Sequence, residues 1–235
     1  MPGFKVPSCA ECGSHSTSVL ETLTVLELET VDSTKTCRAY DRGGQLFQRG
    51  QHPQGLFCIH AGHVKITREG HDGREQIIRF AGPGDVIGYG SLVAGRPYHT
   101  AATAVEKSHV CFIPRDVITR AVRENPQMAL RMMQMMSGEL DEAERRVVEL
   151  AQKSVRERVA EALLVLRETF GVMDDGETLN MQLTREEIAD IVGTAPESVI
   201  RMLSDLRHDH IIDTEGRRIV LKNVPALIKA ANVED

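Results

Sequence analysis

The sequence contains no tryptophan, and only 4% of its 235 residues are aromatic. It has no run of about eighteen apolar residues, which excludes an ordinary transmembrane helix. Its first residues lack the basic and apolar segments of a secretory signal peptide. It also lacks the sequence signatures of a nucleophile elbow, a P-loop and a Rossmann fold. We therefore expect a cytoplasmic protein that has no membrane partner and is not an enzyme.

The composition is that of a globular protein, with 41% hydrophobic and 26% charged residues. A chain of this length can form one large domain or two smaller ones, and we expect two. The net charge of −6 argues against non-specific coating of nucleic acid. It does not exclude a basic face on one part of the surface.

Cysteine is also scarce, and the five cysteines are an odd number. Cys9 and Cys12 form a Cys-x-x-Cys pair near the start of the chain, ahead of any strong helix or strand pattern. In a reducing compartment thiols stay reduced, so such a pair indicates metal binding or redox chemistry more than a structural disulfide.

Short apolar runs follow one another between residues 37 and 114, separated by glycine-rich turns. This spacing is typical of a compact β barrel or β roll. Asp72-Gly73 predicts a hairpin turn, because glycine accepts the positive φ of tight turns. Ahead of these runs, residues 20–28 fit either a short helix or a strand. The predicted strands cover residues 56–59, 64–67, 76–80, 85–89, 100–105 and 109–113.

A long helical pattern occupies residues 124–152 and has Pro126 in its first turn. Met133, Leu140 and Val147 recur at seven-residue intervals, as in a helix that pairs with a second copy of itself. The alternative is a helix that packs on the β domain of its own chain.

Residues 153–235 include a pattern for two short helices around a tight turn, followed by two short strands. Thr184 and Glu187 predict a capping box at the start of the first of these two helices, and Gly193 ends that helix. Pro196 begins the second helix. The two strands predict a hairpin of the kind called a wing.

The second helix of this pair carries the chemistry of a DNA reader. Glu197 and Arg201 lie four residues apart, so they share one face of the helix. Arginine donates two hydrogen bonds to guanine, and a neighbouring carboxylate can accept one from cytosine and orient the guanidinium. The alternative is a solvated ion pair, which is common on surface helices. The predicted DNA contacts also include Thr194, Arg185, Ser198 and Arg217.

Several segments together resemble the CRP/FNR family of bacterial transcription regulators. They are GLFCIHAGHVKI, GPGDVIG, VCFIP, LTREEIADIVGTAPESVIRML and IID-TEGRRIVL, and the likeness covers nearly the whole chain. The resemblance implies an α+β protein with a β roll of the cyclic-nucleotide-binding type (a double-stranded β-helix), a long dimerisation helix and a C-terminal winged helix-turn-helix. The expected parts are an N-terminal arm at 1–36, the roll at 37–123, the dimerisation helix at 124–152 and the DNA-binding domain at 153–235.

The same resemblance implies a homodimer on a palindromic DNA site, with RNA polymerase as a further partner. It makes Glu197 and Arg201 base-reading residues. Pro196 and Ile200 depart from the residue types of the best-known branches, which leaves the sequence of the half-site open.

A cyclic nucleotide in such a roll needs a carboxylate for the ribose and an arginine for the phosphate, because a buried phosphate must be paired. Tyr89 stands where the receptor pattern has glutamate, and His99-Thr100 stand where it has arginine followed by serine or threonine. Arg96 is three residues out of register. We therefore do not expect a cyclic nucleotide as the ligand, and a regulator that responds to one is kept as the alternative.

The resemblance to the FNR branch instead implies an iron–sulfur cluster, which is held by four thiolates. In that branch an N-terminal cysteine group joins one cysteine of the roll. Cys9 and Cys12 match the first part and Cys111 matches the second. We expect a [4Fe–4S] cluster on these three residues and one more ligand. Through this cluster, redox conditions, oxygen or NO would control the regulator.

The fourth ligand departs from the pattern of the branch, whose third N-terminal cysteine would lie near Thr17. We predict that Cys37 takes this role, with His15 or Cys58 as the alternatives. Cys58, inside an apolar run, also fits a buried filler.

Other interpretations stay open. The N-terminal pair could bind zinc or form a redox disulfide, and the protein could act without any ligand. A metal-dependent barrel enzyme of the cupin type would need two histidines on one strand face and a carboxylate. His60 and His63 are three residues apart, which places them on opposite faces unless Gly62 makes a bulge.

Overall fold

The structure is a computed structural model that describes residues 8–12, 18–70 and 72–233. The chain divides into two compact units. The first unit comprises residues 1–69 and 78–141, and the second comprises residues 70–77 and 142–235. None of the helices in the described ranges is long and apolar enough to cross a membrane.

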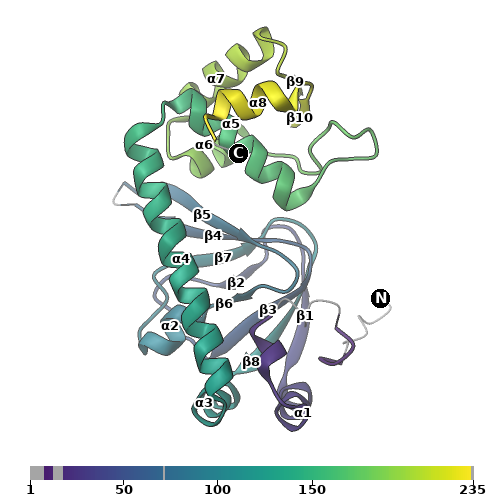
Figure 1. Ribbon diagram of the computed structural model, residues 1–235, viewed down its shortest axis with the longest axis vertical. Coiled ribbons are helices and arrows are strands. Elements are labelled where there is room, and N and C mark those ends of the chain that lie inside the picture. Colours follow the sequence, from purple (N-terminus) through teal and green to yellow (C-terminus); the bar gives the residue numbers. More distant parts are fainter. Residues whose placement is uncertain (1–7, 13–17, 71, 234–235) are drawn as a thin grey trace. The chain divides into compact units, whose positions relative to one another are not determined.

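The strands before residue 115 form two four-stranded sheets (Figure 1). The first sheet has the order β1 (Thr36–Tyr40), β8 (Ser108–Pro114), β3 (Gly55–Ala61) and β6 (Val86–Ile87). The second has the order β2 (Gln45–Phe47), β7 (Ala101–Ala104), β4 (Val64–Glu69) and β5 (Glu75–Ala81). The pairs β1–β8, β3–β8, β3–β6, β2–β7 and β4–β7 are antiparallel. The predicted β roll is confirmed.

The inner strands β3 and β8 of the first sheet are largely buried on both faces. Their side chains alternate between two cores because successive residues of a strand point to opposite sides. In β3, Phe57 and Ile59 belong to one core, where Phe47 stacks on Tyr98 with ring centroids 4.0 Å apart. Leu56 and Cys58 belong to the other core, which also holds residues of the helices outside the sheets. Cys58 and Phe57, which are neighbours in β3, therefore lie in different cores.

Four short helical segments accompany the sheets of the first unit. They are the 3₁₀ helix η1 (Val19–Thr22), α1 (Val25–Thr34), α2 (Tyr89–Ala94) and α3 (Arg115–Glu124). Residues 20–28 therefore contain helical segments and no strand. Of the two structures that the sequence allowed here, the helix is the one observed. The predicted strand at 85–89 is wrong at its end, because Gly88 adopts φ +87° and turns the chain into α2.

The long helix α4 (Pro126–Gln152) begins in the first unit and ends in the second. Its first turns pack into the core of the first unit through Met128 and Met132, which are buried. Met133, Leu140 and Val147 are exposed on the same helix, by 58%, 58% and 66%. Packing on the chain's own roll therefore accounts for only one face of α4.

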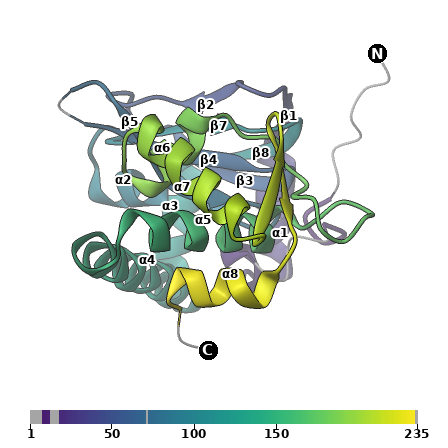
Figure 2. The ribbon, with the colours of Figure 1, turned by 90° about the horizontal axis from the view of Figure 1, so that it is seen from above.

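The second unit contains α5 (Val155–Phe170), α6 (Arg185–Val192), α7 (Pro196–His208), β9 (Ile212–Glu215), β10 (Arg218–Leu221) and α8 (Val224–Ala231) (Figure 2). Strands β9 and β10 form an antiparallel hairpin. Helix α5 contacts α6, α7 and α8, so it is the central element of this unit. The predicted helix-turn-helix with a wing is confirmed, whereas α8 was not predicted.

Candidate functional site

Local signals fix the ends of the two helices of the helix-turn-helix. The backbone N–H of Thr184 donates to Glu187 Oε2 at 2.8 Å, and the Glu187 N–H donates to Thr184 Oγ1 at 3.0 Å. This capping box satisfies backbone donors that would otherwise lack partners at the helix start. Gly193 ends α6 at φ +70°, and Pro196 occupies the first turn of α7. The chain therefore enters α7 with a fixed direction.

Helix α7 has one buried face and one exposed face. Val199, Leu203 and Leu206 are buried and fasten the helix to the rest of the second unit. The opposite face carries Glu197, Ile200, Arg201 and Ser204, all exposed. Because an α-helix turns by about 100° per residue, these four side chains share one arc. An exposed face of this kind at the start of the second helix is what major-groove recognition requires.

The two predicted base-reading residues are available for contacts outside the chain. In the part of the chain that the structure describes, the Glu197 carboxylate and the Arg201 guanidinium form no ion pair with each other. The alternative, a solvated ion pair between Glu197 and Arg201, is therefore not observed. Removing either side chain would leave no partner unpaired among the described residues.

The other predicted DNA contacts are placed differently. Arg217 is exposed at the wing, next to the turn at Gly216. Thr194 and Ser198 are half-buried beside the start of α7. Arg185 is also half-buried, and its Nη2 donates to the carbonyl of Gly216 at 3.3 Å. Burial lowers the pKa of Arg185. Its side chain thus supports the wing, a contact that the sequence pattern did not indicate.

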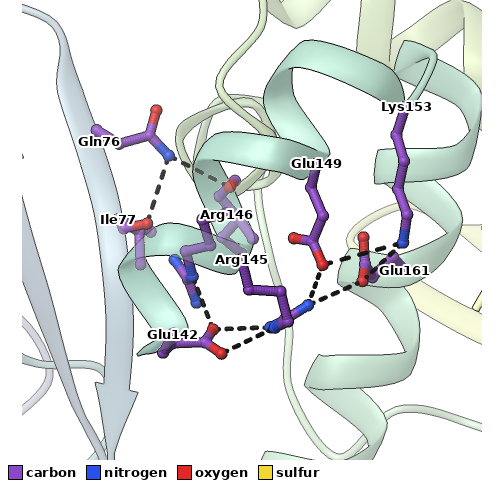
Figure 3. Close-up of polar contacts among 9 residues, drawn as sticks. Gln76, Ile77, Glu142, Arg145, Arg146, Glu149, Lys153 and Glu161 are labelled. Carbon is purple, nitrogen blue, oxygen red and sulfur yellow. Dashed lines mark hydrogen bonds and ion pairs between the residues drawn. The ribbon is translucent and has the colours of Figure 1, made fainter. Parts of the chain in front are cut away.

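An ion-pair cluster joins the end of α4 to α5 within the second unit, as Figure 3 shows. The Arg145 guanidinium contacts the carboxylates of Glu142 at 2.8 Å and Glu161 at 3.3 Å, and it also pairs with Glu149. Lys153 Nζ lies 3.0 Å from Glu161. Burial, followed by the neighbouring Glu161, raises the pKa of Glu149. Since α5 contacts both α6 and α7, this cluster links the long helix to the helices of the candidate DNA interface.

Three cysteines of the first unit lie in one row across neighbouring strands. Cys111 of β8 is the register partner of Cys37 in β1 and of Cys58 in β3. Cys37 and Cys111 form a disulfide, whereas Cys58 is a buried free thiol. Burial, together with the nearby Cys12, raises the pKa of Cys58 to about 12. The row faces the core that also contains Cys9.

The N-terminal pair is anchored beside this row. The Cys9 backbone N–H donates to Asp32 Oδ1 at 2.9 Å, and Lys35 Nζ donates to Cys9 Sγ at 3.1 Å. The Lys35 side chain is only 4% exposed and pairs with Asp32. Burial raises the pKa of Cys9, and the Lys35 ammonium opposes this rise. Cys12 Sγ lies 3.2 Å from His60 Nδ1.

All five cysteines therefore belong to one region of the first unit, which is called the cysteine group below (Cys9, Cys12, Cys37, Cys58 and Cys111). The predicted ligands Cys9, Cys12, Cys37 and Cys111 are brought together, but two of them are joined in the disulfide. In the described ranges, no three His, Cys, Asp or Glu side chains are arranged to hold a metal ion. His15 and Thr17, which entered the sequence prediction, lie outside the described residues.

Two family models match this chain. Residues 37–125 match the cyclic nucleotide-binding domain, and residues 157–230 match the Crp-like helix-turn-helix domain. The order and location of the two matches agree with the β roll and with the α6–α7 pair and its wing. The chain belongs to the CRP/FNR family of transcription regulators. Transcription regulation by DNA binding, and not enzymatic catalysis, is the activity of this family.

Relatives support the same family over nearly the full length. The fumarate and nitrate reduction regulatory protein of Vibrio cholerae is 26% identical over 227 residues, which cover 96% of this chain and 90% of that protein. The anaerobic regulatory protein of Pasteurella multocida is 25% identical over 223 residues, covering 94% and 81% of the two chains. The solved structure of FixK2 from Bradyrhizobium japonicum is 29% identical, has a TM-score of 0.72, and covers 86% of this chain and 100% of that one.

The positions that hold a cyclic nucleotide in the receptor-type branch of the CRP/FNR family have other roles in this structure. Tyr89 is buried and hydrogen-bonded to Glu139 of α4, and Arg79 Nη2 donates to the same carboxylate at 2.8 Å. Burial and Glu139 raise the pKa of Tyr89. Arg96 and His99 are exposed. The carboxylate and the arginine that a nucleotide needs are thus not supplied by these residues.

The histidines considered for a barrel enzyme do not converge. His60 lies beside Cys12, and the strand register shifts between Ile59 and Ala61. Gly62 lies between β3 and β4 with φ +80°, so it belongs to the turn and not to a bulge within one strand. His63 Nδ1 instead lies 2.5 Å from Glu106 Oε1. The enzyme alternative is further set aside by membership of a family of transcription regulators.

Proposed function

We propose that this regulator binds a palindromic DNA site as a homodimer, with one α7 helix in the major groove of each half-site. The exposed face of α7 with Glu197 and Arg201 supports this proposal. In helix-turn-helix dimers the two recognition helices meet half-sites about one helical turn apart, and the symmetry of the site follows from that of the dimer.

The second copy is expected to pack along α4. Met133, Leu140 and Val147 are spaced by seven residues and are more than half exposed. Apolar residues at this spacing are typical of paired helices, and their exposure in a single chain leaves an apolar stripe without a partner. Both the palindromic site and the homodimer can be tested by using the full chain to select the sequences it binds from a pool of random duplexes. Two inverted half-sites are expected, and a single asymmetric site would contradict the dimeric arrangement.

We further propose that redox conditions control DNA binding through the cysteine group. The observation that carries this proposal is the strand register, which aligns Cys37, Cys111 and Cys58 on the sheet face where Cys9 is also buried. Free thiols and a disulfide side by side form a redox-active set. The names of the Vibrio and Pasteurella relatives, which refer to fumarate and nitrate reduction and to anaerobic regulation, agree with a response to oxygen.

An iron–sulfur cluster in this donor set requires the Cys37–Cys111 bond to be reduced, since four thiolates hold such a cluster. Cys9, Cys12 and Cys111 would then hold it together with Cys37 or Cys58, and a [4Fe–4S] cluster would supply oxygen-sensitive redox chemistry. Lys35 and Asp32 keep the N-terminal pair at the sheet, and the Lys35 ammonium offsets part of the negative charge that thiolates bring. Oxidised protein, with the disulfide closed, offers only three thiols.

Anaerobic reduction followed by addition of iron and sulfide tests the cluster. Brown protein with iron and sulfide in near-stoichiometric amounts is expected, and the Cys9→Ser and Cys111→Ser variants should lose both. Comparison of Cys37→Ser with Cys58→Ser identifies the fourth ligand. Protein that stays colourless would remove the cluster proposal and leave DNA binding untouched.

A second candidate for redox control is the Cys37–Cys111 disulfide itself, which the structure contains. Opening this bond frees β1 from its covalent link to β8 without any metal. If colourless protein still changes its DNA affinity between reducing and oxidising buffers, and Cys37→Ser abolishes that change, the disulfide is the sensor.

A further inference from the structure

Ile200 is the one large apolar side chain on the exposed face of α7 within residues 196–208. It is 53% exposed, whereas Val199, Leu203 and Leu206 of the same helix are buried. The helix is therefore fastened to its unit without Ile200. Single exposed apolar residues are common on protein surfaces, so exposure alone assigns no role to this residue.

The neighbours of Ile200 give the second observation. Ile200 lies three residues after Glu197 and directly before Arg201, so the three side chains occupy an arc of about 100° near the start of the helix. In the described structure, Glu197 and Arg201 do not form an ion pair with each other. A helix that brings Glu197 and Arg201 to base edges therefore brings Ile200 to the same groove.

The chemistry of the major groove restricts what Ile200 can contact. Every base edge there presents hydrogen-bonding groups, and the C5 methyl of thymine is the apolar group among them. Isoleucine has no donor or acceptor, so placing it against the cytosine amino group would remove water from that group without replacing its hydrogen bond. Against a thymine methyl, the same side chain buries apolar surface on both sides.

We propose that Ile200 determines specificity by contacting the methyl group of a thymine beside the base pair that Arg201 reads. This inference rests on the proposed docking of α7 in the major groove. Ile200 differs from the residue types found at this position in the best-known branches, and it would give each half-site a preference for thymine.

Replacement of thymine by deoxyuridine in the selected duplex isolates this contact, since uracil keeps the hydrogen-bonding edge and lacks only the methyl group. The full-length dimer is titrated against duplexes in which each thymine of a half-site is replaced in turn. Uracil at one position should weaken binding about fourfold per half-site, the effect of one buried methyl group, and about 15-fold when both half-sites are changed.

Three variants complete the test. Ile200→Ala should bind the thymine and uracil duplexes equally, while Ile200→Val should keep most of the discrimination. Met173→Ala, which shortens an exposed apolar side chain of the same unit outside α7, is the matched control and should discriminate as the unmodified protein does. Circular dichroism and binding to random DNA at low salt establish that each variant is folded.

The outcomes separate this inference from the proposed function. If replacing thymine by uracil changes the affinity of the unmodified protein and of Ile200→Ala by the same factor at every position, the inference is wrong although DNA recognition stands. If the unmodified protein selects no sequence at all, the proposed docking of α7 fails as well. If Ile200→Ala alters complex formation with a protein partner and leaves every DNA affinity unchanged, the side chain belongs to a protein interface and the inference is overturned.

Discussion

Replacement of Arg201 by alanine is the most direct perturbation of the candidate DNA interface. The side chain is exposed on α7 and has no ion-pair partner at Glu197, so its loss should leave the stability of the second unit nearly unchanged. A bidentate arginine–guanine contact contributes about 1–3 kcal/mol of discrimination per base pair. With one α7 in each half-site, the dimer should lose about 2–6 kcal/mol of specific binding free energy, or roughly 30-fold to 20,000-fold in Kd.

The assay is a fluorescence anisotropy titration of the selected duplex and of a scrambled duplex at several salt concentrations. Arg207→Ala is the matched control, because Arg207 is an exposed arginine at the other end of the same helix. We expect that variant to change binding to both duplexes by the same factor, since the general attraction of a positive charge to phosphates carries no sequence information. Base reading by Arg201 is refuted if Arg201→Ala also weakens both duplexes by the same factor.

Three further predictions concern other parts of the chain. Leu140→Asp should convert the dimer into monomer in sedimentation experiments, because it places a charge on the exposed stripe of α4, whereas the exposed Gln134→Asp on the same helix should not. Cys58, whose pKa burial raises to about 12, should resist iodoacetamide at pH 8 in the folded protein and react after unfolding, as mass spectrometry can follow. Hydrogen bonds from Thr178, first from its side chain, lower the pKa of Asp175 from 3.8 to about 2. Because this folded-state pKa is depressed, Asp175 stabilises the second unit above pH 3.8, and its contribution is lost as the pH falls from there toward 2. Asp175→Asn should flatten that part of the pH dependence in urea unfolding, and an unchanged slope would contradict the assignment.

The helix-turn-helix could be read from the sequence because its signals are local. The capping box at Thr184, the glycine after α6 and the proline at the start of α7 act within a few residues of their own positions. Helix α2 escaped prediction for the converse reason. Its sequence, YGSLVA, is short and continues an apolar run, so only the positive φ of Gly88 in the folded chain separates it from β6.

The role of Arg185 also depended on the folded chain. As a basic residue in the first turn of α6 it fits a phosphate contact, and the sequence pattern contains nothing against that role. Its hydrogen bond to Gly216 joins residues that are 31 positions apart. No periodicity along the chain reports such a contact, because it exists only after the wing folds back toward α6.

The order of roll, long helix and winged helix-turn-helix follows from local patterns along the chain. The face of α7 that presents Glu197 and Arg201 follows in the same way, since helical periodicity and end signals are properties of neighbouring residues. How the cysteines meet, in contrast, depends on the folded chain. Cys37 and Cys111 are 74 residues apart, and their pairing follows from strand register, which is set by which faces of the sheet are buried. The docking of Cys9 on Lys35 and Asp32 has the same origin, because burial brings together groups that the order of residues keeps apart.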